Sequence, residues 1–198
     1  MKKGLIGIIV VVVAVLGIYN FWKGNYNQMV TLDEGVKSQW AQVQNQYQRR
    51  LDLIPNLVAT VQGYAAHEAS VFTQVAQARA EAGGVVNIDS SVLEDPEAFK
   101  KYQAIQDNLS SSLQRLLAVQ ENYPELKANE NFMALQDELE GTENRIAVAR
   151  QDYNRAVQIY NTFIRRFTQS VIANQHGFEK RPQFAASQEA QSAPKVEF

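Results

Sequence analysis

The stretch that decides the fold is residues 48–68, QRRLDLIPNLVATVQGYAAHE. It joins two long segments of helical periodicity and contains Pro55, the first proline of the chain. A proline inside a helix removes one hydrogen bond and crowds the preceding turn, so the helix either kinks and continues or ends here and restarts. The unbroken apolar spacing through Leu51, Ile54 and Val58 favours a kink. Length favours a turn, because four segments of about 25 to 45 residues can then pack as an up-and-down bundle.

The segment before this stretch and the last helical segment of the chain both carry apolar residues at helical spacing. In the segment before this stretch, the steps are three or four residues throughout, at Met29, Leu32, Val36, Trp40, Val43 and Tyr47. The last helical segment alternates steps of three and four over five heptads, at Phe132, Leu135, Leu139, Thr142, Ile146, Ala149, Tyr153, Ala156, Tyr160, Phe163 and Phe167. A repeat of this kind predicts coiled-coil-like packing against neighbouring helices.

Helix starts are marked by capping residues. Asp95 can cap a helix whose first position is Pro96, and that helix is expected to end near Pro124. Asn129 or Asn131 can cap the last helix. No strand pattern of any length appears, so the sequence predicts an all-α protein: an antiparallel four-helix bundle with long coiled-coil-like helices, preceded by an N-terminal transmembrane helix.

The transmembrane helix is predicted from Gly4–Trp22, 19 residues without a charge. At 1.5 Å per residue this segment spans ~28 Å, close to the hydrocarbon thickness of a bilayer. A cleaved signal peptide is the alternative, but the apolar run is longer than usual and has no A-x-A site. Lys2 and Lys3 favour a cytoplasmic N-terminus and an extracytoplasmic bundle. The predicted domains are an anchor at 1–25, a bundle at 26–177 and a flexible polar tail at 178–198.

Composition excludes several classes of function. The net charge of -2 argues against nucleic acid, because a basic face is needed to displace counterions. The absence of cysteine excludes a disulfide scaffold, a thiol nucleophile and thiolate zinc sites. The two histidines are over 100 residues apart and lack further ligands at metal spacing, so neither a metal nor another cofactor is expected.

Candidate contact residues gather in residues 48–68. Arg49 and Arg50 can bind anionic lipid or a carboxylate of a partner, or they can be solvated cations at a helix end. His67 and Glu68 resemble half of a metalloprotease helix, but position 71 is not histidine. Asn56 completes the predicted set of partner contacts in this stretch.

Two further candidates lie in the tail. Val196 and Phe198 are two residues apart, so an extended peptide could show both to one side, as in strand addition to a partner. A frayed terminus is the alternative.

Several strings resemble the LemA family of bacterial membrane-anchored proteins. They are Trp40-Ala41-Gln42-Val43, Asp52-Leu53-Ile54-Pro55-Asn56-Leu57-Val58, Gly63-Tyr64-Ala65, Glu121-Asn122-Tyr123-Pro124, Glu143-Asn144-Arg145-Ile146, Tyr153-Asn154 and Tyr160-Asn161. The resemblance implies an antiparallel four-helix bundle behind a membrane helix, with a turn at Pro55 and no established enzymatic activity. It also implies an envelope metalloprotease or a TPM-type domain protein as partner. Some relatives carry a lipid-modified cysteine after the apolar run, where this chain has Ile18.

The expected function is a non-enzymatic, membrane-anchored scaffold or adaptor of the bacterial cell envelope. It is expected in the inner membrane as a single-pass protein, contacting the bilayer through residues 4–22, self-associating and recruiting protein partners. The alternatives are a bundle that binds anionic lipid through Arg49 and Arg50, and a hydrolase or metal enzyme hidden in the bundle.

Overall fold

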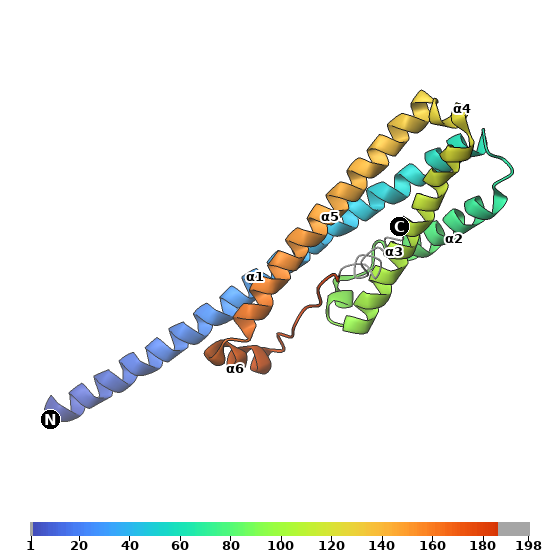
Figure 1. The fold of residues 1–198 in the computed structure, drawn as a ribbon. Helices are drawn as coiled ribbons and strands as arrows, with labels where there is room; N and C mark the ends of the chain where they lie inside the picture. Colours follow the sequence, from blue (N-terminus) through green and yellow to red (C-terminus); the bar gives the residue numbers. More distant parts are fainter. Residues whose placement is uncertain (1, 186–198) are drawn as a thin grey trace, which may run out of the picture.

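The computed structural model describes residues 2–185, and within that range the regular structure is helical throughout. Residue 1 and residues 186–198 lie outside the described part of the chain. The elements are α1 Lys2–Gln62, α2 Ala69–Val85, the 3₁₀ helix η1 Ser90–Leu93, α3 Pro96–Ala118, the 3₁₀ helix η2 Val119–Asn122, α4 Pro124–Lys127, α5 Glu130–Ile164 and α6 Phe167–His176 (Figure 1).

One helix contains both the predicted anchor and the first helix of the body. α1 has 61 residues and passes through Gly24 and Asn25 without a break, so the predicted boundary at residue 25 is not a break in the fold. Its first third projects beyond the other helices, and its apolar side chains are exposed (Figure 1). Among the described helices, α1 is the one long and apolar enough to cross a membrane. The protein is therefore membrane-associated through a single N-terminal segment.

Pro55 lies inside α1 and makes no turn, which corrects the turn inferred from the resemblance. The chain reverses eight residues later, in the segment between Gln62 and Ala69. A proline leaves the carbonyl four residues earlier without its helical donor. Here that carbonyl belongs to Leu51, and Arg79 Nε of α2 donates to it at 3.4 Å. A neighbouring helix thus satisfies the acceptor that the proline exposes.

Replacing Pro55 with Ala is expected to raise the free energy of unfolding by about 1–2 kcal/mol, because Ala restores the missing donor and favours helix. The Arg79→Ala substitution is expected to cost less in that background than in the wild type, since Leu51 then has its helical partner. Chemical denaturation of the full-length protein in detergent measures both. Asn56→Ala, at the next exposed position, is the control for helix propensity alone. Equal costs of Arg79→Ala in the two backgrounds would contradict this account.

The helices pack as two antiparallel pairs. α5 runs back along α1 over most of the length of α5. The shorter α2 and α3 pack on each other beside the membrane-distal part of α1 (Figure 1). The predicted apolar stripes form the core: Trp40 of α1, Leu109 of α3 and Tyr153 of α5 are all buried. The all-helical prediction is confirmed.

The predicted helix caps are confirmed. The Asp95 carboxylate accepts hydrogen bonds from the backbone N–H groups of Glu97 and Ala98, with Pro96 at the first helical position. The Asn129 side chain accepts one from Phe132 N–H at the start of α5.

The last helix ends earlier than its apolar stripe predicts. α5 ends at Ile164, and Arg166 has an extended backbone (φ -63°, ψ 147°) before α6 begins. The break turns α6 beside the membrane-proximal part of α1, where Gln169 Nε2 donates to Asn25 Oδ1 at 2.9 Å. Phe167, predicted in the buried stripe, is exposed instead.

The chain beyond α6 is extended and packed against the helices. Gly177 ends α6 in the left-handed region (φ 74°), a conformation that glycine adopts without strain. Residues 178–185, hereafter the strap, then run along α5 toward α3 (Figure 1). The structure therefore places the first residues of the predicted tail in the folded body. The prediction of a flexible tail at 186–198 lies outside the described residues.

Candidate functional site

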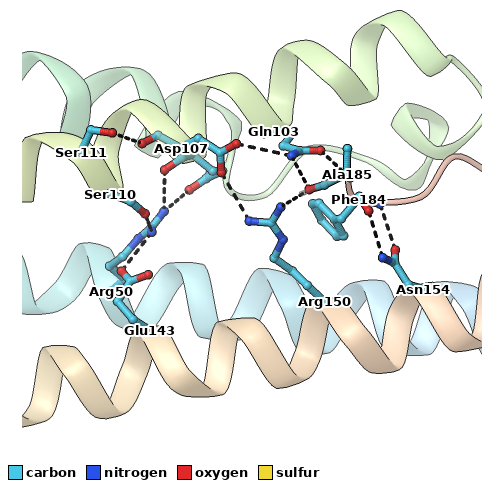
Figure 2. A network of polar contacts seen from close by, with 11 residues as sticks. Arg50, Gln103, Asp107, Ser110, Ser111, Glu143, Arg150, Asn154, Phe184 and Ala185 are labelled. Carbon is cyan, nitrogen blue, oxygen red and sulfur yellow. Dashed lines mark hydrogen bonds and ion pairs between the residues drawn. The ribbon is translucent and has the colours of Figure 1, made fainter. Parts of the chain in front are cut away.

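A buried arginine connects three helices. Arg50 of α1 is 1% exposed. Its Nη1 donates to Ser110 Oγ at 2.6 Å and to Glu143 Oε1 at 3.1 Å, and its Nη2 donates to Gln106 Oε1 at 2.7 Å (Figure 2). These partners belong to α3 and α5, so one guanidinium fixes the position of α1 against both. Burying this charge is costly unless it is paired and hydrogen-bonded, as it is here.

A second set of polar contacts lies beside this arginine, on the side of the strap. Asp107 accepts from Arg150 Nη1 at 3.3 Å, and Arg150 Nη2 donates to the carbonyl of Ala185 at 3.2 Å (Figure 2). Gln103 of α3 holds the same strap residue twice, donating to its carbonyl at 3.0 Å and accepting from its N–H at 3.2 Å. The end of the strap is thus held by side chains from both α3 and α5.

Two asparagines of α5 hold the strap by its backbone. Asn154 donates to the carbonyl of Phe184 at 3.0 Å and accepts from its N–H at 2.9 Å. Asn161, seven residues later on α5, makes the same pair with Arg181 at 2.9 Å and 2.9 Å. Seven helical residues rise ~10.5 Å and three extended residues span ~10 Å, so the two repeats match in length.

The tyrosine before each asparagine adds a third contact. Tyr153 donates to the carbonyl of Pro182 at 3.0 Å, and Tyr160 donates to the carbonyl of Glu179 at 3.0 Å. In each case the acceptor is two residues before the strap residue that the asparagine holds. We call these two Tyr-Asn pairs the α5 ladder. Because the ladder contacts backbone atoms, it recognises an extended chain independently of most of its side chains.

Arg181 and Phe184 of the strap supply a charged and an aromatic contact, and Gln183 Nε2 adds a hydrogen bond to the carbonyl of Asn154 at 3.0 Å. Arg181 donates through Nε and Nη2 to Asp33 Oδ1 at 3.1 and 2.9 Å, and its Nη1 lies 3.1 Å from Glu94 Oε1. Lys37 Nζ lies 3.0 Å from the other oxygen of Asp33. The carboxylate is buried, and two cations share it. A forked guanidinium suits such a site better than an ammonium would.

The aromatic contact is that of the Phe184 ring, which fills a pocket of aromatic residues. Its centroid lies 4.8 Å from that of Phe99, 5.4 Å from Tyr153 and 6.1 Å from Trp40. The Arg150 guanidinium covers its remaining face at 4.5 Å from the centroid. Offset and edge contacts of this kind stabilise aromatic clusters beyond the area they bury.

Removing one asparagine of the α5 ladder is expected to release the strap locally. Asn161→Ala deletes two hydrogen bonds worth about 1 kcal/mol each, so the open state should become about 30-fold more populated. The measurement is the initial rate of trypsin cleavage after the exposed Lys180, in the full-length protein in detergent. Asn144→Ala, at an exposed position of the same helix, is the control and should leave the rate unchanged. An equal rate in both variants would show that the ladder does not hold the strap.

Burial also shifts the pKa of four tyrosines in this region. It raises the pKa of Tyr47 and Tyr160 to about 12, and it raises the pKa of Tyr102 and Tyr153. The unfolded chain keeps a tyrosine pKa of about 10. Since the folded-state values are higher, the folded protein holds these protons more tightly. The resulting stabilisation is complete below about pH 10 and is lost as the pH rises from there through the folded-state pKa of about 12.

An alkaline titration checks this expectation. Followed by tyrosinate absorbance, the four buried tyrosines should ionise above pH 10 and only together with loss of helical circular dichroism. The chain unfolded in denaturant is the control and should titrate all eight tyrosines near pH 10. A folded protein that titrates all of them near pH 10 would rule out their burial.

The predicted contact residues do not form one site. Arg50 is inside the body, so it does not face lipid or a partner; the physical reason is the set of acceptors that α3 and α5 place around its guanidinium. Arg49 is exposed and pairs with Glu138 Oε1 at 2.8 Å. Asn56 and His67 are exposed at separate places on α1 and in the turn after it.

The remaining predicted residues divide between the turn and the tail. Glu68 is half-buried and accepts from Tyr123 Oη at 3.4 Å. Val196 and Phe198 lie outside the described residues. No three His, Asp or Glu side chains gather at metal-binding distance anywhere in residues 2–185.

The contacts that the sequence interpretation missed are those of the strap. The sequence signal for the strap contacts is the pair of Tyr-Asn dipeptides seven residues apart, Tyr153-Asn154 and Tyr160-Asn161. Their tyrosines fall in the apolar stripe, and the asparagines beside them mark the groove next to it.

The family of the chain follows from comparison with known proteins. The model described as "LemA family" matches residues 39–198, which include the ladder and the strap. The chain belongs to the LemA family. The matched region begins at residue 39, after the apolar segment of α1, so the family match covers most of the body of this LemA protein and the residues that follow the strap.

Curated relatives of this LemA protein include magnetosome proteins. Magnetosome proteins MamQ 1 and MamQ 2 of Paramagnetospirillum magneticum are each 28% identical over 174 residues, covering 80% of this chain and 64% of theirs. Magnetosome protein MamQ of Magnetospirillum gryphiswaldense is 28% identical over 170 residues, covering 78% and 62%. The matched region thus spans less than two thirds of the length of these relatives.

Proposed function

We propose that this LemA protein is a non-enzymatic, membrane-anchored scaffold or adaptor of the bacterial cell envelope that self-associates and recruits protein partners. The observation that carries the proposal is the α5 ladder, which holds an extended segment through backbone contacts repeated at matched intervals. A surface of this kind is suited to holding protein segments, because extended peptides are commonly bound through their main chain.

The continuous α1 supports the same role. It joins the apolar segment to the body without a flexible linker, so the body has a defined distance from the bilayer. In this proposal α1, α2, α3 and α5 act as one antiparallel four-helix bundle that the apolar segment anchors to the inner membrane. Lys2 and Lys3 favour a cytoplasmic N-terminus, which leaves the bundle extracytoplasmic.

The family membership and the MamQ relatives favour this class of function over an enzyme. Arg50, half of the basic pair on which the lipid-binding alternative depended, is buried. The partners proposed are a second copy of the chain, and an envelope protease or a TPM-type domain protein.

Site-specific photo-crosslinking in intact cells tests the proposal. A photoreactive residue replaces Gln183, whose side chain is exposed on the strap, or Met133, exposed at the start of α5 as the control. We expect adducts with a second copy and with other membrane proteins from position 183 and fewer from 133. A purified protein that is strictly monomeric in detergent and yields no intermolecular adduct from either position would rule out the scaffold.

A further inference from the structure

α6 lies at the level where the membrane segment ends. The apolar run of α1 ends at Trp22, and Lys23 is the first charged residue after it. Trp22 Nε1 lies 3.5 Å from His176 Nε2 at the end of α6, and Asn25 Oδ1 accepts from Gln169 Nε2 at 2.9 Å. Three residues of α1 rise ~4.5 Å, so these contacts hold α6 within a few ångströms of the end of the apolar segment along α1.

The surface that α6 leaves uncovered is apolar. Phe167 is 94% exposed, more than any other large apolar side chain in residues 4–185, and Val171 is 55% exposed. The two are four residues apart and share one face of the helix. An aromatic ring without neighbours is costly in water, and a ring placed at this level has the headgroup region of the bilayer beside it.

Basic residues border this apolar face. Arg165 and Arg166 directly precede Phe167 and are exposed. Neither forms an ion pair with another residue of the described range 2–185. Exposed lysine or arginine beside exposed aromatic residues is the pattern of helices that lie in a membrane interface.

A cleft between α1 and α6 continues the same surface toward the bilayer. Its lining includes Ile18 and Tyr19 of the apolar segment, Lys23 of α1, and His176 of α6. Beyond Trp22 the lining becomes polar and includes the Lys23 ammonium, as the acyl chains and phosphates of a lipid would require.

We propose that α6 is a second membrane contact, in which Phe167 and Val171 enter the headgroup region while Arg165 and Arg166 bind lipid phosphates. The occupant of this surface is the bilayer that holds α1. This surface differs from the lipid-binding alternative of the sequence analysis, which relied on Arg49 and Arg50. Arg50 is buried and cannot contact lipid. Two points of attachment instead of one would fix the tilt of the body, and with it the direction in which the α5 ladder faces.

Spin labelling of the full-length protein in lipid nanodiscs tests the proposal. The chain contains no cysteine, so a single introduced cysteine is labelled unambiguously. The test variant is Val171→Cys. The matched control is Val148→Cys on α5, where the valine is 57% exposed and lies 19 residues before the first residue of α6. The readout is the collision rate of the nitroxide with oxygen, which concentrates in lipid, relative to a water-soluble nickel complex.

In nanodiscs containing anionic lipid, we expect the oxygen-to-nickel ratio at position 171 to exceed that at 148 several-fold. Adding Phe167→Asp, or replacing Arg165 and Arg166 with Gln, should return the ratio at 171 toward the control while helical circular dichroism is unchanged. Equal ratios at 171 and 148 would overturn the proposal. Shielding of position 171 from both reagents would also overturn it, because it would show that protein rather than lipid covers α6.

Discussion

Replacing Glu143 with Gln is expected to lower the free energy of unfolding by about 2–4 kcal/mol. Removing one partner of a buried ion pair typically costs about 3–5 kcal/mol, because the other charge remains buried without a counterion. Here the counterion of Arg50 is lost while an acceptor of the same shape remains. The Glu143 side chain is 38% exposed, so water screens part of the pair and lowers the expected cost. Chemical denaturation of the full-length protein in detergent gives the value.

A neighbouring ion pair between the same two helices provides the control. Arg49 and Glu138 also join α1 to α5, at 2.8 Å, but both side chains are exposed. Exposed pairs contribute about 0–1 kcal/mol, so Glu138→Gln should have a small effect. If the two substitutions cost the same, the burial of Arg50 would not determine the stability of the network.

A double substitution separates the charge from the shape of the site. Arg50→Met removes the cation and keeps an unbranched chain, but it leaves the buried Gln106 side chain without its donor, at a cost of about 1–3 kcal/mol. Adding Glu143→Gln to that background should then cost little, because no buried charge remains to be left unpaired. Additive costs would show that Arg50 and Glu143 do not act as a pair.

The helices could be predicted from the sequence because their signals are local. The three-and-four spacing of Trp40, Leu109 and Tyr153 depends only on the helical period, and the cap at Asp95 depends on residues within one turn of it. At Pro55 the apolar spacing correctly indicated a continuing helix, whereas the length argument and the family resemblance indicated a turn. The effect of Pro55 on α1 depends on Arg79, which supplies a donor from another helix, and no local sequence signal shows that contact.

The strap could not be predicted for the same physical reason. An extended segment has no internal hydrogen bonds, so its position depends wholly on distant residues such as Asn154 and Asn161. Nothing in residues 178–185 themselves shows that their carbonyls face a helix. Likewise, Arg50 and Asp33 are charged residues, which are usually exposed to solvent. Their burial follows only from the groups that α3 and the strap place beside them.

These contacts give the candidate site a definite dependence on the fold. The ladder lies on α5, the carboxylate that receives Arg181 lies on α1, and the pocket of Phe184 is formed by α1, α3 and α5 together. A change in the packing of these helices therefore alters the strap contacts even when no ladder residue is substituted.

Trp40→Ala tests this dependence and is expected to cost about 3–5 kcal/mol, the range for deleting a buried large aromatic side chain. Trp40 is buried, and its ring centroid lies 5.0 Å from that of Tyr102 and 5.7 Å from that of Tyr153. Its indole N–H has no hydrogen-bond partner in the described residues, so the loss is one of packing. Denaturation followed by circular dichroism measures the stability, with Ile159→Ala as the control because that large apolar side chain is exposed on α5.

The same substitution should also loosen the strap, since Trp40 forms one wall of the Phe184 pocket. We expect faster trypsin cleavage after Lys180 in Trp40→Ala, and a smaller further increase when Asn154→Ala is added than Asn154→Ala produces alone. That result would show that the aromatic pocket and the ladder hold the strap as one unit. If Trp40→Ala lowered the global stability while the cleavage rate stayed at the wild-type value, the ladder and Arg181 alone would hold the strap. The pocket would then serve the core rather than the site.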